Sequence, residues 1–231
     1  MRSLNQIKRG FKVGLPIMLA YFPIAVTYGV LASQAGLSVF ELTGMSLLVY
    51  GGASQMMAIN MILLHASAIE IVIATFVLNF RHFIMSFSFA HRTMATPLKW
   101  RVASTLFITD ETFSVTTVEK DAAKQTNGHL FYFTFVFVSY LSWVVGSFIG
   151  GFVGDIIPDS ISQSFSIALY AMFIALLVPS VKNNFRYGLI ALLAMILNFG
   201  FGQFFQEGWS IVLSTLVASG LGFLVLRRRV L

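Results

Sequence analysis

The sequence predicts an all-α fold that crosses a membrane several times, and three observations support this prediction. Of the 231 residues, 57% are hydrophobic and only 10% are charged, whereas a soluble domain carries roughly a quarter charged residues. The mean hydropathy is +0.83. The apolar stretches are continuous rather than alternating, which is typical of membrane helices and not of membrane β-strands.

The charges and motifs exclude several function classes. The net charge of +6 comes from basic residues that flank apolar segments, so they indicate membrane topology and not a nucleic-acid surface. The absence of cysteine excludes disulfides, thiolate metal sites and cysteine nucleophiles. The chain contains no H-E-x-x-H, G-x-S-x-G or Walker motif, so we predict neither a catalytic residue nor a metal, cofactor or nucleotide site.

Eight apolar segments follow one another without a soluble domain between them, so we expect residues 1–231 to form one integral membrane domain. The segments cover about residues 13–33, 42–65, 68–90, 103–118, 130–153, 160–180, 187–204 and 208–226.

Charge placement predicts how these segments cross the bilayer. If all of them spanned it, the basic residues of 91–101 would face away from the basic N-terminus. If 42–65 and 103–118 each enter and leave on one side, every Lys and Arg except Arg81 faces the cytoplasm, as the positive-inside rule requires. We therefore predict about six spanning helices and two broken or re-entrant segments in a bacterial inner membrane, with both termini cytoplasmic.

The composition of both segments supports such breaks. Gly51–Gln55 interrupts 42–65, and 103–118 is rich in threonine and acids. The alternative for 42–65 is an ordinary helix with a glycine-lined packing face. Broken segments that enter from opposite sides are typical of the inverted repeats of secondary transporters. The Leu-Asn-Phe triplets at 78–80 and 197–199 are consistent with a repeat, although three residues can coincide by chance.

The Gly51–Gln55 turn is the first candidate binding site. Gly51 and Gly52 let a ligand approach the backbone, and a half-helix from about Ser54 would direct N–H groups at an anion such as a carboxylate. Gln55 adds donors and an acceptor, and it is costly in lipid without a partner. The alternative is close helix packing.

Asn79, Arg81 and His82 form the second candidate, in the middle of segment 68–90. At 100° per residue Asn79 and His82 share a face, while Arg81 points almost opposite to Asn79. Either the helix breaks here or Arg81 has a separate partner, which would be a substrate carboxylate or Asp110. His82 is a candidate proton carrier. The alternative is an ion pair that only stabilises the bundle.

Asp110 and Glu111 form the third candidate, for binding a substrate amine or exchanging protons. The alternative is an amphipathic helix at the membrane surface. Pro16 and Pro23 are expected to kink the first helix and to free carbonyl groups along a polar path, or to act only as structural kinks.

These motifs resemble the AzlC family, the large subunits of two-component branched-chain amino acid exporters, from about Gly10 to Arg227. The residues that carry the resemblance are Phe22-Pro23, Tyr28-Gly29, Tyr50–Gln55, Leu78–His82 and Thr109–Phe113. The chain departs from the family pattern at Ala25, where glycine is usual, and at Tyr50, where phenylalanine is frequent.

The resemblance implies export of leucine, isoleucine, valine and also methionine, together with a small AzlD-like membrane subunit. Because the chain has no nucleotide site, proton antiport is the expected driving force, with His82, Asp110 and Glu111 as the coupling groups. The alternatives are a passive channel or facilitator for another small solute, and a membrane enzyme or assembly factor.

Overall fold

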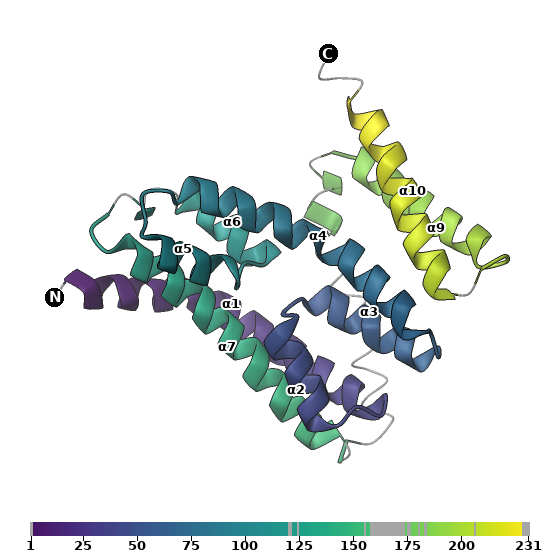
Figure 1. Cartoon of the computed structure of the whole chain (residues 1–231), viewed down its shortest axis with the longest axis horizontal. Helices are drawn as coiled ribbons and strands as arrows, with labels where there is room; N and C mark the ends of the chain where they lie inside the picture. Colours follow the sequence, from purple (N-terminus) through teal and green to yellow (C-terminus); the bar gives the residue numbers. More distant parts are fainter. Residues whose placement is uncertain are drawn as a thin grey trace. The chain divides into compact units, whose positions relative to one another are not determined.

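The computed structural model describes residues 2–119, 122–123, 125–154, 156–157, 174, 177–179, 181–182, 184–205 and 207–227. Within these ranges all regular structure is helical (Figure 1). The chain forms two compact units. Unit 1 consists of Met1–Gln55 and Asn79–Ser162, and unit 2 consists of Met56–Leu78 and Gln163–Leu231.

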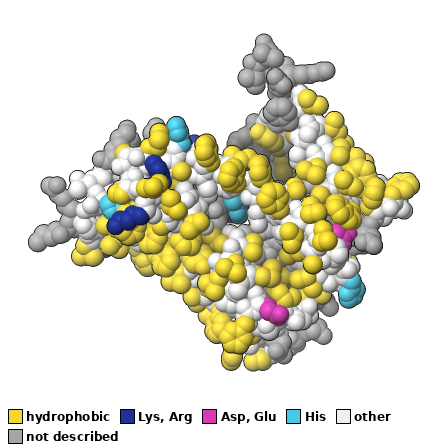
Figure 2. Space-filling model, in the orientation of Figure 1, with side chains coloured by type: hydrophobic (Ala, Val, Ile, Leu, Met, Phe, Trp, Pro, Cys, Tyr) yellow, Lys and Arg dark blue, Asp and Glu magenta, His cyan; other side chains and the backbone are white. Residues whose placement is uncertain are grey.

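The helices confirm a multi-pass helical membrane protein. Among the described residues, three helices are long and apolar enough to span a bilayer: α1 (Arg2–Gln34), α4 (Ala68–Arg92) and α7 (Gly128–Gly154). Shorter apolar helices are α2 (Val39–Leu48), α9 (Arg186–Phe201) and the central part of α10 (Glu207–Arg227). Apolar side chains cover most of the face in Figure 2, as lipid contact requires. The expected segment 160–180 lies almost wholly outside the described residues.

Both segments that the sequence predicted to be interrupted contain a break. Segment 42–65 divides into α2 and α3 (Gly52–Leu63), which are separated by residues 49–51. Segment 103–118 contains the end of α5 (Leu98–Thr105), a break at 106–109 and then α6 (Asp110–Val118). The expected start of the second half-helix at about Ser54 was two residues too late, because the Gln55 N–H bonds the Gly51 carbonyl at 2.8 Å.

Side-chain caps fix where the helices begin. At α6, the Thr109 N–H donates to Thr112 Oγ1 at 2.8 Å, and the Thr112 N–H donates to Thr109 Oγ1 at 3.4 Å. At α4, the Ser67 N–H donates to Glu70 Oε2 at 2.7 Å, which satisfies another backbone donor before the first turn. Such reciprocal bonds satisfy N–H groups that have no partner inside the helix, so they define the N-terminal ends sharply.

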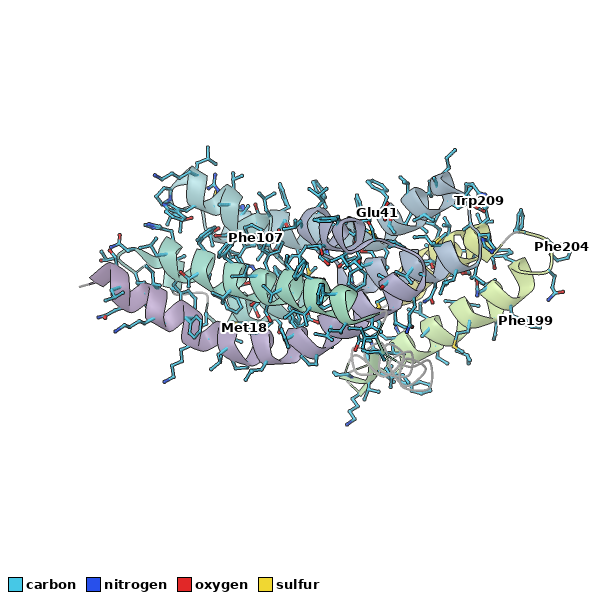
Figure 3. The ribbon with its side chains drawn as sticks, turned by 90° about the horizontal axis from the view of Figure 1, so that it is seen from below. Met18, Glu41, Phe107, Phe199, Phe204 and Trp209 are labelled. Atoms are coloured by element: carbon cyan, nitrogen blue, oxygen red, sulfur yellow. The ribbon has the colours of Figure 1, made fainter. Side chains whose placement is uncertain are left out.

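In unit 1, α1 and α7 lie side by side along their lengths (Figures 1 and 3) and touch through glycines. A Cβ on Gly146 would lie 2.7 Å from the Ala25 Cβ, and one on Gly150 would overlap the Val26 carbonyl oxygen. Small residues allow this backbone contact, which is how membrane helices associate where lipid offers no hydrophobic driving force.

The two prolines do not interrupt α1, which is continuous through Pro16 and Pro23. Thr27 Oγ1 donates to the Pro23 carbonyl at 3.0 Å within the same helix. Side chains that bond the backbone in this way help membrane helices to tolerate proline.

An aromatic core packs around the N-terminal part of α7 in unit 1. Its buried residues are Phe89, Ile108, Ala122, Phe131, Tyr132, Phe135 and Val136. Phe107, labelled in Figure 3, packs from the break at 106–109 against Phe137 and Tyr140 of α7, with ring centroids 5.7 and 4.5 Å apart. The break is therefore anchored to α7 by aromatic contacts.

Unit 2 contains the rest of α3, the beginning of α4, and α9 and α10, which pack on each other. Met61, Ala74 and Val212 form its buried core. Ser210 Oγ donates to the Asn198 carbonyl at 2.7 Å, so a polar bond joins α10 to α9 in an otherwise apolar contact.

Candidate functional site

Every residue that the sequence predicted for substrate binding or proton coupling lies in unit 1. These residues come from the end of the first break and the first turn of α3, from the first turn of α6, and from the middle of α4. The N-terminal ends of α3 and α6 follow the two breaks, and a helix N-terminus carries partial positive charge.

The first break packs closely against α4. A Cβ on Gly51 would lie 3.0 Å from Asn79 Oδ1 and 3.4 Å from His82 Cε1, so only glycine leaves room between the turn and these side chains. The structure therefore places Gly51 against Asn79 and His82, which share a face of α4 as the helical angle predicted. Ser54 lies at the same point, because its Oγ would be 2.6 Å from that Cβ, and its hydroxyl donates to the Gly51 carbonyl at 2.8 Å and caps the turn.

Arg81 has a separate partner, which was one of the two predicted alternatives. The helix α4 is unbroken at this point, and Arg81 Nη1 lies 3.0 Å from Asp110 Oδ2 at the start of α6. His82 Nε2 lies 4.0 Å from the same oxygen. The Asp110 carboxylate therefore lies near the Arg81 guanidinium and the His82 imidazole. A proton on His82 would place a second positive charge beside this carboxylate.

Glu111 has a different set of partners from Asp110. The Tyr21 hydroxyl of α1 donates to Glu111 Oε2 and lies 2.7 Å from Thr109 Oγ1. The two adjacent acids therefore bond to different helices, Asp110 to α4 and Glu111 to α1. Sequence reasoning missed Tyr21, because a lone tyrosine in an apolar helix gives no signal of its own. The Thr109 cap was detectable from the threonine that precedes two acids.

Gln55 lies in a buried polar network rather than at the first break. Its side chain is fully buried, accepts from Trp143 Nε1 at 2.9 Å and donates to Ser46 Oγ at 2.9 Å. Ser46 Oγ donates in turn to Ser147 Oγ at 2.7 Å. This network joins α2 and α3 to α7 and holds the two half-helices in place. Gly52 belongs to it sterically, because a Cβ there would lie 2.6 Å from Trp143 Cη2.

Three buried polar atoms near the two breaks have no hydrogen-bond partner. They are the Tyr50 hydroxyl, Asn79 Oδ1 and Arg81 Nε. Buried polar groups are almost always bonded, so unsatisfied ones require an explanation. The Tyr50 hydroxyl and the Arg81 Nε–H are donors without an acceptor, and Asn79 Oδ1 is an acceptor without a donor.

Comparison with known families identifies the chain. The family model described as AzlC protein matches residues 16–157, which is more than half of the sequence. The chain belongs to the AzlC family. AzlC proteins are membrane transporters and generally not enzymes, and the matched region contains both breaks and every candidate residue, from Pro16 to Glu111.

Individual relatives of this AzlC protein are also membrane proteins. An uncharacterized membrane protein of Archaeoglobus fulgidus is 30% identical over 189 residues, which cover 80% of this chain and 81% of the relative. An uncharacterized membrane protein of Helicobacter pylori is 30% identical over 149 residues, 63% of each chain. The inner membrane protein YgaZ of Escherichia coli is 28% identical over 141 residues, 61% of this chain and 58% of YgaZ.

The match thus covers less than two thirds of the bacterial relatives. No solved structure matches this AzlC chain.

Proposed function

We propose that this AzlC protein is a secondary transporter that exports branched-chain and other neutral hydrophobic amino acids, with leucine, isoleucine and valine as the main substrates and methionine as a further candidate. The observation that carries the proposal is the group of unsatisfied polar atoms beside two helix breaks. Broken membrane helices bind the charged groups of small solutes in many secondary transporters. Membership of the family is consistent with branched-chain amino acid export.

In this proposal the substrate carboxylate binds beside Gly51 and Gly52. The first turn of α3 directs its N–H groups toward this break, and a helix N-terminus favours an anion. Ser54 shapes the turn through its bond to Gly51. Gln55 fixes the position of the turn through its hydrogen bond with Trp143, so we assign Gln55 a positioning role within the site.

The substrate ammonium binds to acceptors on the opposite side of the break. Asn79 Oδ1 is buried, close to Gly51 and without a donor, so it is suited to accept from an amine. Asp110 supplies negative charge nearby, and Arg81 offers its free Nε–H to an anion while Nη1 holds Asp110. Because Arg81 and Asp110 are each about one third exposed, their pair can open without burying a bare charge.

Proton antiport drives export in this proposal. Glu111 and Asp110 stand at the same helix N-terminus with different partners, and His82 faces Asp110. Protonation of either acid would release Tyr21 or Arg81 and so loosen α6 from α1 or from α4. Titratable groups at membrane depth are costly and usually lie on a transport path.

We further propose the membrane arrangement that the charge distribution predicts. Residues 1–231 form one transporter domain with six spanning helices, two re-entrant segments around the observed breaks, an inverted repeat, and both termini in the cytoplasm. AzlC proteins typically pair with AzlD, so we expect a small AzlD-like subunit to complete the exporter.

The test is counterflow of labelled leucine in proteoliposomes that contain this subunit, alone or with an AzlD-like subunit, with and without a pH gradient. We expect uptake that responds to the gradient and requires or is increased by the partner. Uptake that ignores the gradient would favour a passive facilitator. No leucine uptake in any arrangement would refute the amino acid assignment.

A further inference from the structure

Tyr50 stands at the centre of the first break in a conformation that side chains rarely adopt. Its φ is +36°, in the left-handed region where a residue other than glycine is disfavoured. The side chain is nevertheless 94% buried, with only 6% exposed. Such strain is kept only where the surrounding structure enforces it, and it concentrates at ligand-binding and catalytic sites.

The Tyr50 hydroxyl differs from the other tyrosine hydroxyls of unit 1. Those four each donate to a named acceptor: Tyr21 to Glu111, Tyr28 to Leu42 O, Tyr132 to Glu119 O and Tyr140 to Leu47 O. Among the tyrosines of the described residues, only Tyr50 has a buried hydroxyl without a partner. An unsatisfied buried hydroxyl destabilises a protein, so neither packing nor stability explains its presence here.

The Tyr50 ring is held in place, which fixes the direction of the hydroxyl. It packs edge-on against Tyr140, with ring centroids 5.0 Å apart and an interplanar angle of 89°. The adjacent Gly51 touches Asn79 and His82 of α4. The carboxylate of Glu111 and the hydroxyl of Tyr21 are electrostatic neighbours of Tyr50. The free donor thus belongs to the residue that directly precedes the Gly51–Asn79 contact.

We infer that the Tyr50 hydroxyl contacts the transported solute directly, by donating a hydrogen bond to its carboxylate. This inference rests on the proposed transport of amino acids, and it adds a neutral donor that is particular to this chain, because phenylalanine is frequent at this position in the family. The ligand that satisfies the hydroxyl must carry a hydrogen-bond acceptor at its polar end. A molecule with the same apolar side chain and no carboxylate would leave Tyr50 unsatisfied.

The test compares Tyr50→Phe with the unchanged protein and with Tyr132→Phe. Both variants remove one hydroxyl from a buried ring, but Tyr132 donates to the Glu119 carbonyl at 2.7 Å and belongs to the aromatic core. Binding of leucine and of 3-methylbutylamine, the decarboxylated analogue that has no hydrogen-bond acceptor, is measured on purified protein together with its partner by the ligand-induced shift of the thermal unfolding temperature.

We expect Tyr50→Phe to weaken leucine binding by about tenfold to a hundredfold, because a hydrogen bond to a charged group is lost. Binding of 3-methylbutylamine should change less than threefold, because this ligand has no acceptor for the hydroxyl. Without ligand, Tyr50→Phe should unfold at the same or a higher temperature, while Tyr132→Phe should unfold at a lower one and bind leucine normally.

The outcomes separate this inference from the proposed function. If the unchanged protein neither binds nor transports leucine, the amino acid assignment fails and the role of Tyr50 falls with it. If the unchanged protein binds leucine and Tyr50→Phe binds it equally well, only the role of Tyr50 is refuted. A loss of ligand-free stability in Tyr50→Phe would show a structural partner for the hydroxyl and would also overturn the inference.

Discussion

Replacing Gln55 by leucine tests whether the buried network holds the broken helix in place. The substitution preserves much of the side-chain volume but removes the acceptor of Trp143 Nε1 and the donor to Ser46 Oγ. Ser46 keeps its bond to Ser147, so its hydroxyl is not isolated. The indole N–H, in contrast, becomes a buried donor without an acceptor, since Trp143 is only 3% exposed.

The expected loss of stability follows from the number of buried polar groups that each variant leaves unsatisfied. An unsatisfied buried donor costs about 1–3 kcal/mol, so Gln55→Leu should lower the free energy of unfolding by about 2 kcal/mol. Trp143→Phe should cost a similar amount, about 1–3 kcal/mol, because it leaves the Gln55 carbonyl unsatisfied. The double variant leaves neither group behind. The coupling should therefore reach about 1–2 kcal/mol, above the roughly 0.6 kcal/mol average for polar pairs in membrane proteins.

The assay is reversible unfolding in mixed micelles with increasing dodecyl sulfate, applied to both single variants and the double variant. Ser86→Ala is the control, because Ser86 donates to the Thr105 carbonyl and shares no partner with Gln55. Its effect should add to that of Gln55→Leu. If the effects of Gln55→Leu and Trp143→Phe also add, the bond contributes nothing to stability and the network does not hold the break.

Two further predictions concern the site itself. Arg81→Ala should abolish leucine export without lowering the protein level. Arg81 and Asp110 are each about one third exposed, so their ion pair adds little stability. A fall in protein level that Asp110→Asn reverses would indicate a structural ion pair instead. Gly52→Ala should displace the Trp143 ring, red-shift the tryptophan emission and lower transport. Gly44→Ala is the control and should change neither emission nor transport, because its Cβ meets nothing within 4 Å. Identical emission in the two variants would refute the steric contact.

The sequence predicted the two breaks well because their signals are local. Adjacent glycines at Gly51 and Gly52 lower the helix propensity of an otherwise apolar run. The positions of lysine and arginine gave an independent reason to expect the breaks, because the positive-inside rule predicts the number of membrane crossings without using the glycines. The exact extents were less accurate, because α3 begins at Gly52 and α1 extends back to Arg2 across basic residues that are good helix formers.

The partners of the polar residues were harder to predict. The helical angle separated Arg81 from Asn79, and opposite charge made Asp110 one of two candidate partners. The side chains of Arg81 and Asp110 are paired. Gln55 was expected to need a partner, but that partner is Trp143 on α7, which no spacing along the chain indicates. Tyr21 gave no signal, and Tyr50 was noted only as a departure from the family pattern, because the difference between a bonded and an unbonded hydroxyl exists only in three dimensions.

The glycine contact between α1 and α7 also governs the order in which the molecule can be assembled. Residues 35–127 must be synthesised after α1 before α7 begins, and at about 5–20 residues per second this takes on the order of ten seconds. Throughout this interval Gly10, Gly14 and Gly29 of α1 have no packing partner, because each lies against α7 in the finished protein. A chain truncated before Gly128 should therefore insert its first helix but remain a substrate for membrane proteases.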